Sequence, residues 1–144
     1  MRVVVGVAAL CALAAMLPAS AAAATWTGKT KQGRKVVLRT RGDGHVVRVR
    51  IGWKANCGAG TYTSRTIFEP PFDTSTLTEV ADVGSYTAHP DGYVSKIRVT
   101  LKGWWVAATD RWRGTLAVRV RVRQSGKLID TCRLRKLRWS AGRR

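Results

Sequence analysis

The sequence predicts an all-β protein: an antiparallel β-sandwich, or a partly closed barrel, of about eight strands, preceded by an N-terminal signal peptide. Three observations predict this fold. Apolar and basic residues alternate along several stretches, turn-forming residues separate these stretches at short intervals, and residues 25–144 show no helical periodicity. Residues 25–144 suit a single domain, because a chain of this length buries roughly two-thirds of its unfolded surface.

Residues 1–24 have the three parts of a secretory signal peptide. Arg2 supplies a basic start, an uncharged apolar run follows, and Ala22-Ala23-Ala24 is a small-residue cleavage site. Cleavage there would leave Thr25 as the first residue of a protein that is secreted or associated with the cell envelope. The alternative is an uncleaved membrane anchor, but Pro18 and the alanine run favour cleavage, after which no transmembrane span is expected.

The first half of the domain begins with three strands. Residues 26–30 and 35–41 are predicted to pair around a turn at Gln32-Gly33, and Gly42-Asp43-Gly44 predicts a second hairpin turn. Residues 45–53 alternate strongly and form the third strand. Its predicted inward residues are Val47, Val49, Ile51 and Trp53.

The middle of the domain is patterned less clearly. Residues 61–68 are rich in threonine and aromatic residues and predict a strand, which Pro70 and Pro71 then end. Residues 73–80 fit either a short strand or one helical turn. Residues 83–88 resume strand character before a turn at residues 89–92.

Two long strands follow, at residues 93–105 and 112–124. In the second, one face is apolar and the other basic: the apolar residues are Trp112, Leu116, Val118, Val120 and Val122, and the basic ones are Arg113, Arg119, Arg121 and Arg123. Ser125-Gly126 turns the chain into a last strand from Leu128. The alternation of that strand slips before Leu137, which predicts a β-bulge at residues 133–136.

Two cysteines remain after cleavage, Cys57 and Cys132. A single pair in an exported chain predicts a disulfide bond, which would stabilise the fold by roughly 4–5 kcal/mol because it closes a long loop. Neither histidine stands at a metal-ligand spacing from a cysteine, so no metal site and no cofactor are predicted.

Several turn and core residues are shared with a group of known proteins. They are Trp26, Gly28, Thr30, Gln32 and Gly33, then Cys57, Gly114-Thr115-Leu116, Asp130-Thr131-Cys132 and Trp139-Ser140-Ala141. With these residues the chain resembles small exported β-sandwich proteins of unknown function from high-GC Gram-positive bacteria. The resemblance implies the fold and the disulfide, and it implies no activity.

Basic residues outnumber acidic ones, 26 to 8, and they concentrate in the last quarter of the chain. Their alternation places many of them outward, about 7 Å apart along a strand, where they suit phosphate or carboxylate polymers. The residues predicted to bind polyanions are Arg119, Arg121, Arg123, Arg133, Arg135, Lys136 and Arg138. The partner would be an anionic polysaccharide, a teichoic acid or another polyanion. Sequence-specific binding of nucleic acid is not predicted, because no recognition helix is visible.

Trp104 and Trp105 are adjacent and therefore face opposite sides of their strand. Trp105 has the parity of core residues, whereas Trp104 has that of outward lysines and arginines. An exposed Trp104 would be a stacking platform for a sugar ring or a base. The alternative is that a bulge or a loop covers it.

No catalytic residue is predicted. Glu69, Asp73, Glu79 and Asp82 could supply the carboxylate pair of a glycosidase, although clustered loop acids are usually solvated or paired with arginines. The loops of residues 69–91 are therefore the candidate site of a small hydrolase or inhibitor. The leading hypothesis is a non-catalytic exported module that binds anionic polymers through its basic face. The alternatives are that hydrolase or inhibitor, and a purely structural domain whose charge reflects composition alone.

Overall fold

The computed structural model describes residues 22–144; residues 1–21 of the predicted signal peptide lie outside the described residues. The strands are β1 (Ala24–Thr30), β2 (Lys35–Thr40), β3 (Val46–Cys57), β4 (Gly60–Phe68), β5 (Thr74–Ser75), β6 (Glu79–Ala88), β7 (Val94–Val106), β8 (Arg111–Gln124) and β9 (Lys127–Arg143). A three-residue 3-10 helix, Ala107–Thr109, connects β7 to β8. Within residues 22–144, no helix has the length and apolar character needed to span a membrane.

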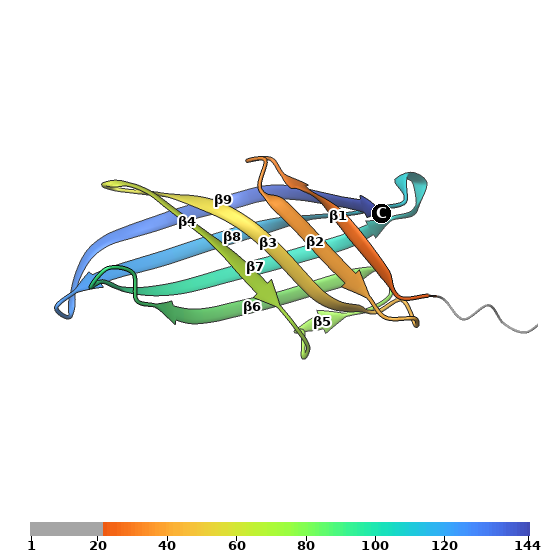
Figure 1. Cartoon of the computed structure of the whole chain (residues 1–144), viewed down its shortest axis with the longest axis horizontal. Coiled ribbons are helices and arrows are strands. Elements are labelled where there is room, and N and C mark those ends of the chain that lie inside the picture. The colour runs from red at the N-terminus through yellow and green to blue at the C-terminus, as the bar shows by residue number, and fades with distance from the viewer. Residues whose placement is uncertain (1–21) are drawn as a thin grey trace, which may run out of the picture.

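All nine strands belong to one antiparallel sheet, in the order β4-β3-β2-β1-β9-β8-β7-β6-β5. The sheet folds back on itself, so that the layer β1–β4 crosses over the layer of β6–β9 (Figure 1). The predicted all-β sandwich is confirmed, with nine strands where about eight were expected. The undecided stretch at residues 73–80 contains the two-residue β5 and the turn that leads into β6.

The core lies between the two layers. The first layer contributes Leu38, Ile51 and Trp53, and the second contributes Leu101, Leu116 and Val120, all of them fully buried. Along β8 the predicted alternation is confirmed, since Trp112, Leu116, Val118 and Val120 are buried while Arg113, Arg119 and Arg121 are exposed. Val122, near the end of β8, is half-buried against the core.

Two hairpin turns lie where the sequence predicts them, at residues 89–92 and at residues 125–126. At Asp91-Gly92 and at Ser125-Gly126 both central residues have positive φ, the conformation that suits two-residue hairpins and favours glycine at the second position. Tight turns of this kind set the register of β6 with β7 and of β8 with β9.

Three bulges change which residues face the core. In β9 the predicted bulge is confirmed: Leu116 pairs with Leu137 but Val118 pairs with Leu134, so an extra residue lies between them and Leu137 and Trp139 return to the core. In β3 an unpredicted bulge at Val47 buries Val46 and leaves Val47 only half-buried, which corrects the inward position expected for Val47. A third bulge, at Ile129, turns Leu128 outward. Leu128 is therefore exposed, which corrects the inward position expected from its alternation with Cys132.

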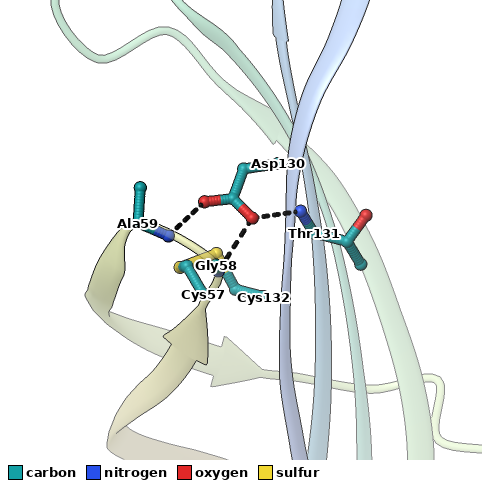
Figure 2. The surroundings of a disulfide bond; sticks show 6 residues. All are labelled: Cys57, Gly58, Ala59, Asp130, Thr131 and Cys132. Atoms are coloured by element: carbon teal, nitrogen blue, oxygen red, sulfur yellow. Dashed lines mark hydrogen bonds between the residues drawn. A yellow bond between two sulfur atoms is a disulfide. The ribbon is translucent and has the colours of Figure 1, made fainter.

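A disulfide and a carboxylate join the two layers where β3 meets β9. The predicted Cys57–Cys132 bond is present, and it links residues 75 apart in the chain. Asp130 accepts hydrogen bonds from the backbone N–H groups of Gly58 (2.9 Å), Ala59 (3.1 Å) and Thr131 (2.7 Å), as Figure 2 shows. These hydrogen bonds lower the pKa of Asp130, those from Gly58 and Ala59 most strongly.

Candidate functional site

Basic side chains point outward from β7, β8 and β9, and we call this surface the β7–β9 face. Arg98, Arg119 and Arg133 stand directly opposite one another across the three strands. One row further along, Lys96 stands opposite Arg121. Neighbouring residues in such a row are about 5 Å apart, and successive rows are about 7 Å apart. The face is therefore a two-dimensional array of cations.

The structure places most of the predicted polyanion-binding residues on the β7–β9 face, in two hollows. Arg119, Arg133 and Arg135 line a shallow one of about 290 Å³ together with Arg98. Lys136 and Arg138 line a larger groove, described below. Arg121 is exposed on β8 beyond both hollows. Arg123 is half-buried, and its Nη1 donates to the carbonyl oxygen of Gly126 at 2.9 Å, so it holds the hairpin turn.

The larger groove, which we call the Trp104 groove, has a volume of about 700 Å³. It lies across the four neighbouring strands β1, β9, β8 and β7, and Trp104 belongs to β7. Six basic residues and no acidic residue line it: Lys29, Lys31, Arg111, Arg113, Lys136 and Arg138. Thr115 and Ser140 add hydroxyl groups to the walls. More cations line this groove than line the shallow hollow around Arg119 and Arg133.

The floor of the Trp104 groove is formed by Trp139 and Gly114, which are packed into the core. Trp139 is buried, and its indole ring lies against Gly103 and Gly114, where a Cβ atom on either glycine would overlap the ring. Gly114 would also have no room for a Cβ beside the backbone carbonyl of Lys102. The glycines therefore let a large aromatic side chain seal the core directly under a charged surface.

Trp104 and Trp105 face opposite sides, as predicted. Trp105 packs with Trp26, at a ring-centroid distance of 5.0 Å, and with Trp112 at 6.1 Å. Trp104 is 42% exposed and forms part of the groove wall, so neither a bulge nor a loop covers it. Its neighbour in register on β8 is the exposed Arg113, and on β6 it is Glu79.

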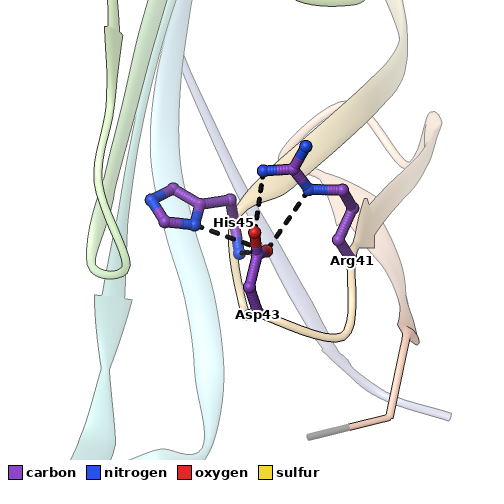
Figure 3. A network of polar contacts seen from close by, with 3 residues as sticks. All are labelled: Arg41, Asp43 and His45. Atoms are coloured by element: carbon purple, nitrogen blue, oxygen red, sulfur yellow. Dashed lines mark hydrogen bonds and ion pairs between the residues drawn. The ribbon is translucent and has the colours of Figure 1, made fainter.

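Few cations of the described residues are neutralised by carboxylates. Arg41 pairs with Asp43 at 2.8 Å in the β2–β3 turn, beside His45 (Figure 3). The backbone N–H of His45 and the guanidinium of Arg41 lower the pKa of Asp43. Arg48 pairs with Glu69 at 2.6 Å. No other arginine or lysine in residues 22–144 lies within 4.0 Å of a carboxylate, so the β7–β9 face keeps its charge.

The acids of residues 69–91 are spread over several elements. Glu69 follows β4 and binds Arg48, Asp73 precedes β5, and Glu79 and Asp82 belong to β6. None of these acids lines either of the two hollows described above. Residues 22–144 also contain no group of three or more His, Cys, Asp or Glu side chains placed to hold a metal ion.

Sequence reasoning missed the cations that reach the Trp104 groove from β1 and from the start of β8. Lys29 and Lys31 lie far from the C-terminal cluster in the chain, and only the pairing of β1 with β9 brings them beside Arg138. Arg111 also lines the groove, but it was not among the residues predicted to bind polyanions. The outward parity of Arg113 was readable, but nothing in the sequence linked it to Trp104. Comparisons with protein-family models, with curated proteins and with solved structures found no match.

Proposed function

We propose that this protein is a non-catalytic module that is exported and binds linear anionic polymers at the cell envelope or outside the cell. The polymer is a polysaccharide, a teichoic acid or another chain of phosphate or carboxylate groups. The observation that carries the proposal is the Trp104 groove, with six basic residues and no acidic one along its walls.

Electrostatics supports binding of an anion to the β7–β9 face. Like charges directly opposite each other across a sheet destabilise it, yet Arg98, Arg119 and Arg133 form such a row with no carboxylate within an ion-pair distance. A bound row of oxyanions would relieve this repulsion. Guanidinium groups suit the task, because each one presents a planar fork of donors to a phosphate or carboxylate.

Salt dependence of binding tests the proposal. A single-stranded oligonucleotide serves as the probe, because it presents a regular row of phosphates and its affinity falls with log salt by about 0.7 per contact. Replacing Arg119 and Arg133 with serine should flatten the slope by about 1.4, the value of two contacts. Replacing Lys127 and Arg144, at a hairpin tip and at the chain end, removes the same charge elsewhere and should change the slope less. Absence of binding at low salt, or equal slopes for the two variants, would contradict the proposal.

The Trp104→Ala variant, titrated in the same way, separates the contribution of stacking to the affinity from that of charge. If bases stack on its ring, Trp104→Ala should weaken binding by about 1–3 kcal/mol and leave the salt slope unchanged, because no phosphate contact is lost. A matched titration with an acidic oligosaccharide shows whether the ring also receives sugars. Unchanged affinity for both ligands would remove Trp104 from the site.

Export is tested by sequencing the N-terminus of protein recovered outside the cell. The proposal expects Thr25 at the start. In the structure Thr25 already lies in β1, where it pairs with Arg39, so cleavage after Ala24 would leave the strand nearly whole. Protein that keeps Met1 and stays in the membrane fraction would show an anchor instead.

A further inference from the structure

A second basic hollow adjoins the Trp104 groove. It has a volume of about 500 Å³, and we call it the Arg50 groove. Its lining residues come from β2, β3, β4 and the turn that precedes β2, and four of them are basic while none is acidic. They are Arg34, Lys35, Arg50, Gly52, Thr63, Ser64 and Arg65.

The β1–β2 hairpin joins the two grooves. Lys29 lines the Trp104 groove and Lys35 lines the Arg50 groove, yet the two lysines are partners in register. Directly opposite residues of an antiparallel pair have their side chains on the same face. At the turn, the backbone N–H of Thr30, in the first groove, donates to the carbonyl oxygen of Arg34, in the second, at 2.8 Å. The two grooves are therefore parts of one continuous outer surface.

A row of outward residues runs from strand to strand through both grooves, and we call it the cross-strand row. From β4 to β7 its members are Arg65, Gly52, Lys35, Lys29, Ser140, Arg113 and Trp104. Each is the partner in register of the next, except that Lys35 stands beside Gly52 one step beyond the pair Val36 and Ile51. Strands are about 4.8 Å apart, so the six steps from β4 to β7 cover about 29 Å of surface.

The cross-strand row has a defined end on each side. Arg65 belongs to β4, which is an edge strand of the sheet. Beyond Trp104 the next residue in register is Glu79 on β6, an exposed acid that repels an anion. Between these ends the row passes from the β1–β4 layer to the β6–β9 layer where β1 pairs with β9. A linear anion that follows the row would therefore extend from β4 to β7 and end there.

Gly52 leaves room for a ligand in the Arg50 groove. A Cβ atom on Gly52 would come within 3.2 Å of the Cβ of Arg34. The next outward positions of β3 on either side carry long cationic side chains, Arg50 and Lys54. The absence of a side chain at Gly52 therefore opens a space between cations.

Carboxylates of residues 22–144 leave the charge of both grooves free. Glu69 is bound to Arg48, and neither residue lines a groove. Within the same residues, no basic side chain that lines either groove has a carboxylate within 4.0 Å. The same cationic chemistry therefore continues from one groove into the other.

We propose that the Trp104 groove and the Arg50 groove form one binding site, in which a single linear polyanion lies across the strands from β4 to β7. This inference rests on the proposed function and extends its site to Arg34, Lys35, Arg50 and Arg65. The ligand is defined by a row of oxyanions, and either phosphates or carboxylates supply that chemistry. A chain long enough to reach both grooves gains affinity, because its second set of contacts forms within the same complex.

A length series of ligands tests the extended site. The probes are oligothymidylates of three to eight units, which supply phosphates, and oligogalacturonates of the same lengths, which supply carboxylates. In a series that binds, the slope of log affinity against log salt should steepen with length until the ligand covers the row. For oligothymidylates the expected increment is about 0.7 per added contact. The eight-unit probe should bind as one molecule per protein chain.

Two variants with the same net charge give the decisive comparison. Arg50→Ser with Arg65→Ser should flatten the slope for the eight-nucleotide probe by about 1.4, the value of two contacts, and should change the slope for the three-nucleotide probe less. Retained binding of the shortest probe shows that this variant is folded. The control, Lys127→Ser with Arg144→Ser, should change the slope for the eight-nucleotide probe less than the first variant does. The same ranking is expected for oligogalacturonates if carboxylates are bound.

The outcomes separate this inference from the proposed function. A slope that does not steepen with length, or equal slopes of the two variants with the longest probe, would overturn the extended site and leave the Trp104 groove as the whole site. Two eight-unit molecules bound to one wild-type chain would also overturn it, because the grooves would then act separately. Failure of every probe to bind at low salt would instead overturn the proposed function itself.

Discussion

Removing the disulfide should cost this fold about a third or more of a typical domain's stability. Cys57 and Cys132 are separated by 75 residues, and the bond between them joins the end of β3 to β9. In the chain-entropy model a cross-link over a loop of this length restricts the unfolded chain by about 4.5 kcal/mol at 25 °C. Small domains are stable by about 5–15 kcal/mol, so the loss is large.

The perturbation is the double substitution Cys57→Ala and Cys132→Ala. Alanine is preferred to serine because Cys132 is fully buried, and a hydroxyl there would need a hydrogen-bond partner. Urea unfolding gives the free energy, and a rise in its slope is expected because the unfolded chain becomes more expanded. Wild-type protein unfolded in the presence of a reductant should behave like the variant.

Hydrogen exchange locates the effect. Asn56 is the one residue of β3 that pairs directly with β9, at Arg133, so the junction has little backbone pairing to hold it without the disulfide. Amide protection should therefore fall first near residues 56–59 and 130–133, and last in the buried part of β8. A loss of stability below about 1 kcal/mol, or first exposure of β8, would refute the reasoning.

Two further predictions concern the core and the junction carboxylate. Val120→Ala should destabilise by roughly 1–3 kcal/mol because Val120 is fully buried, and Arg121→Ser by well under 1 kcal/mol; the opposite ranking in urea unfolding would mean that the faces of β8 are reversed. Asp130 has a pKa below its ordinary value of 3.8, so its contribution to stability is present above about pH 4 and is lost as the pH falls through the folded-state pKa. Asp130→Asn should therefore lower the urea midpoint at pH 6 and converge with wild type near pH 2, whereas a gap that is independent of pH would contradict this account.

Local sequence predicted the elements of the sandwich because strand alternation and turn chemistry are local properties. The two faces of β8 follow from the alternation of apolar and basic residues. The turn at Ser125-Gly126 is predicted by its glycine, which readily adopts the positive φ that a two-residue hairpin turn requires. The bulge in β9 was also readable, since Leu137 and Trp139 fall out of phase with Cys132. The bulge at Val47 was not, because Val46 and Val47 are both apolar and either one fits the core.

The candidate site depended on tertiary structure. Alternation says whether a side chain points toward the core or away from it, but not which of the two outer surfaces it occupies. Arg50 and Arg119 have the same outward parity, and only strand pairing places them on opposite sides of the sandwich. The same holds for Lys29, which reaches the Trp104 groove because β1 pairs with β9 across more than a hundred residues of chain. The sequence by itself determined the strands, the disulfide and the excess of outward cations; long-range pairing, which no local pattern encodes, decided which of those cations gather around the Trp104 groove.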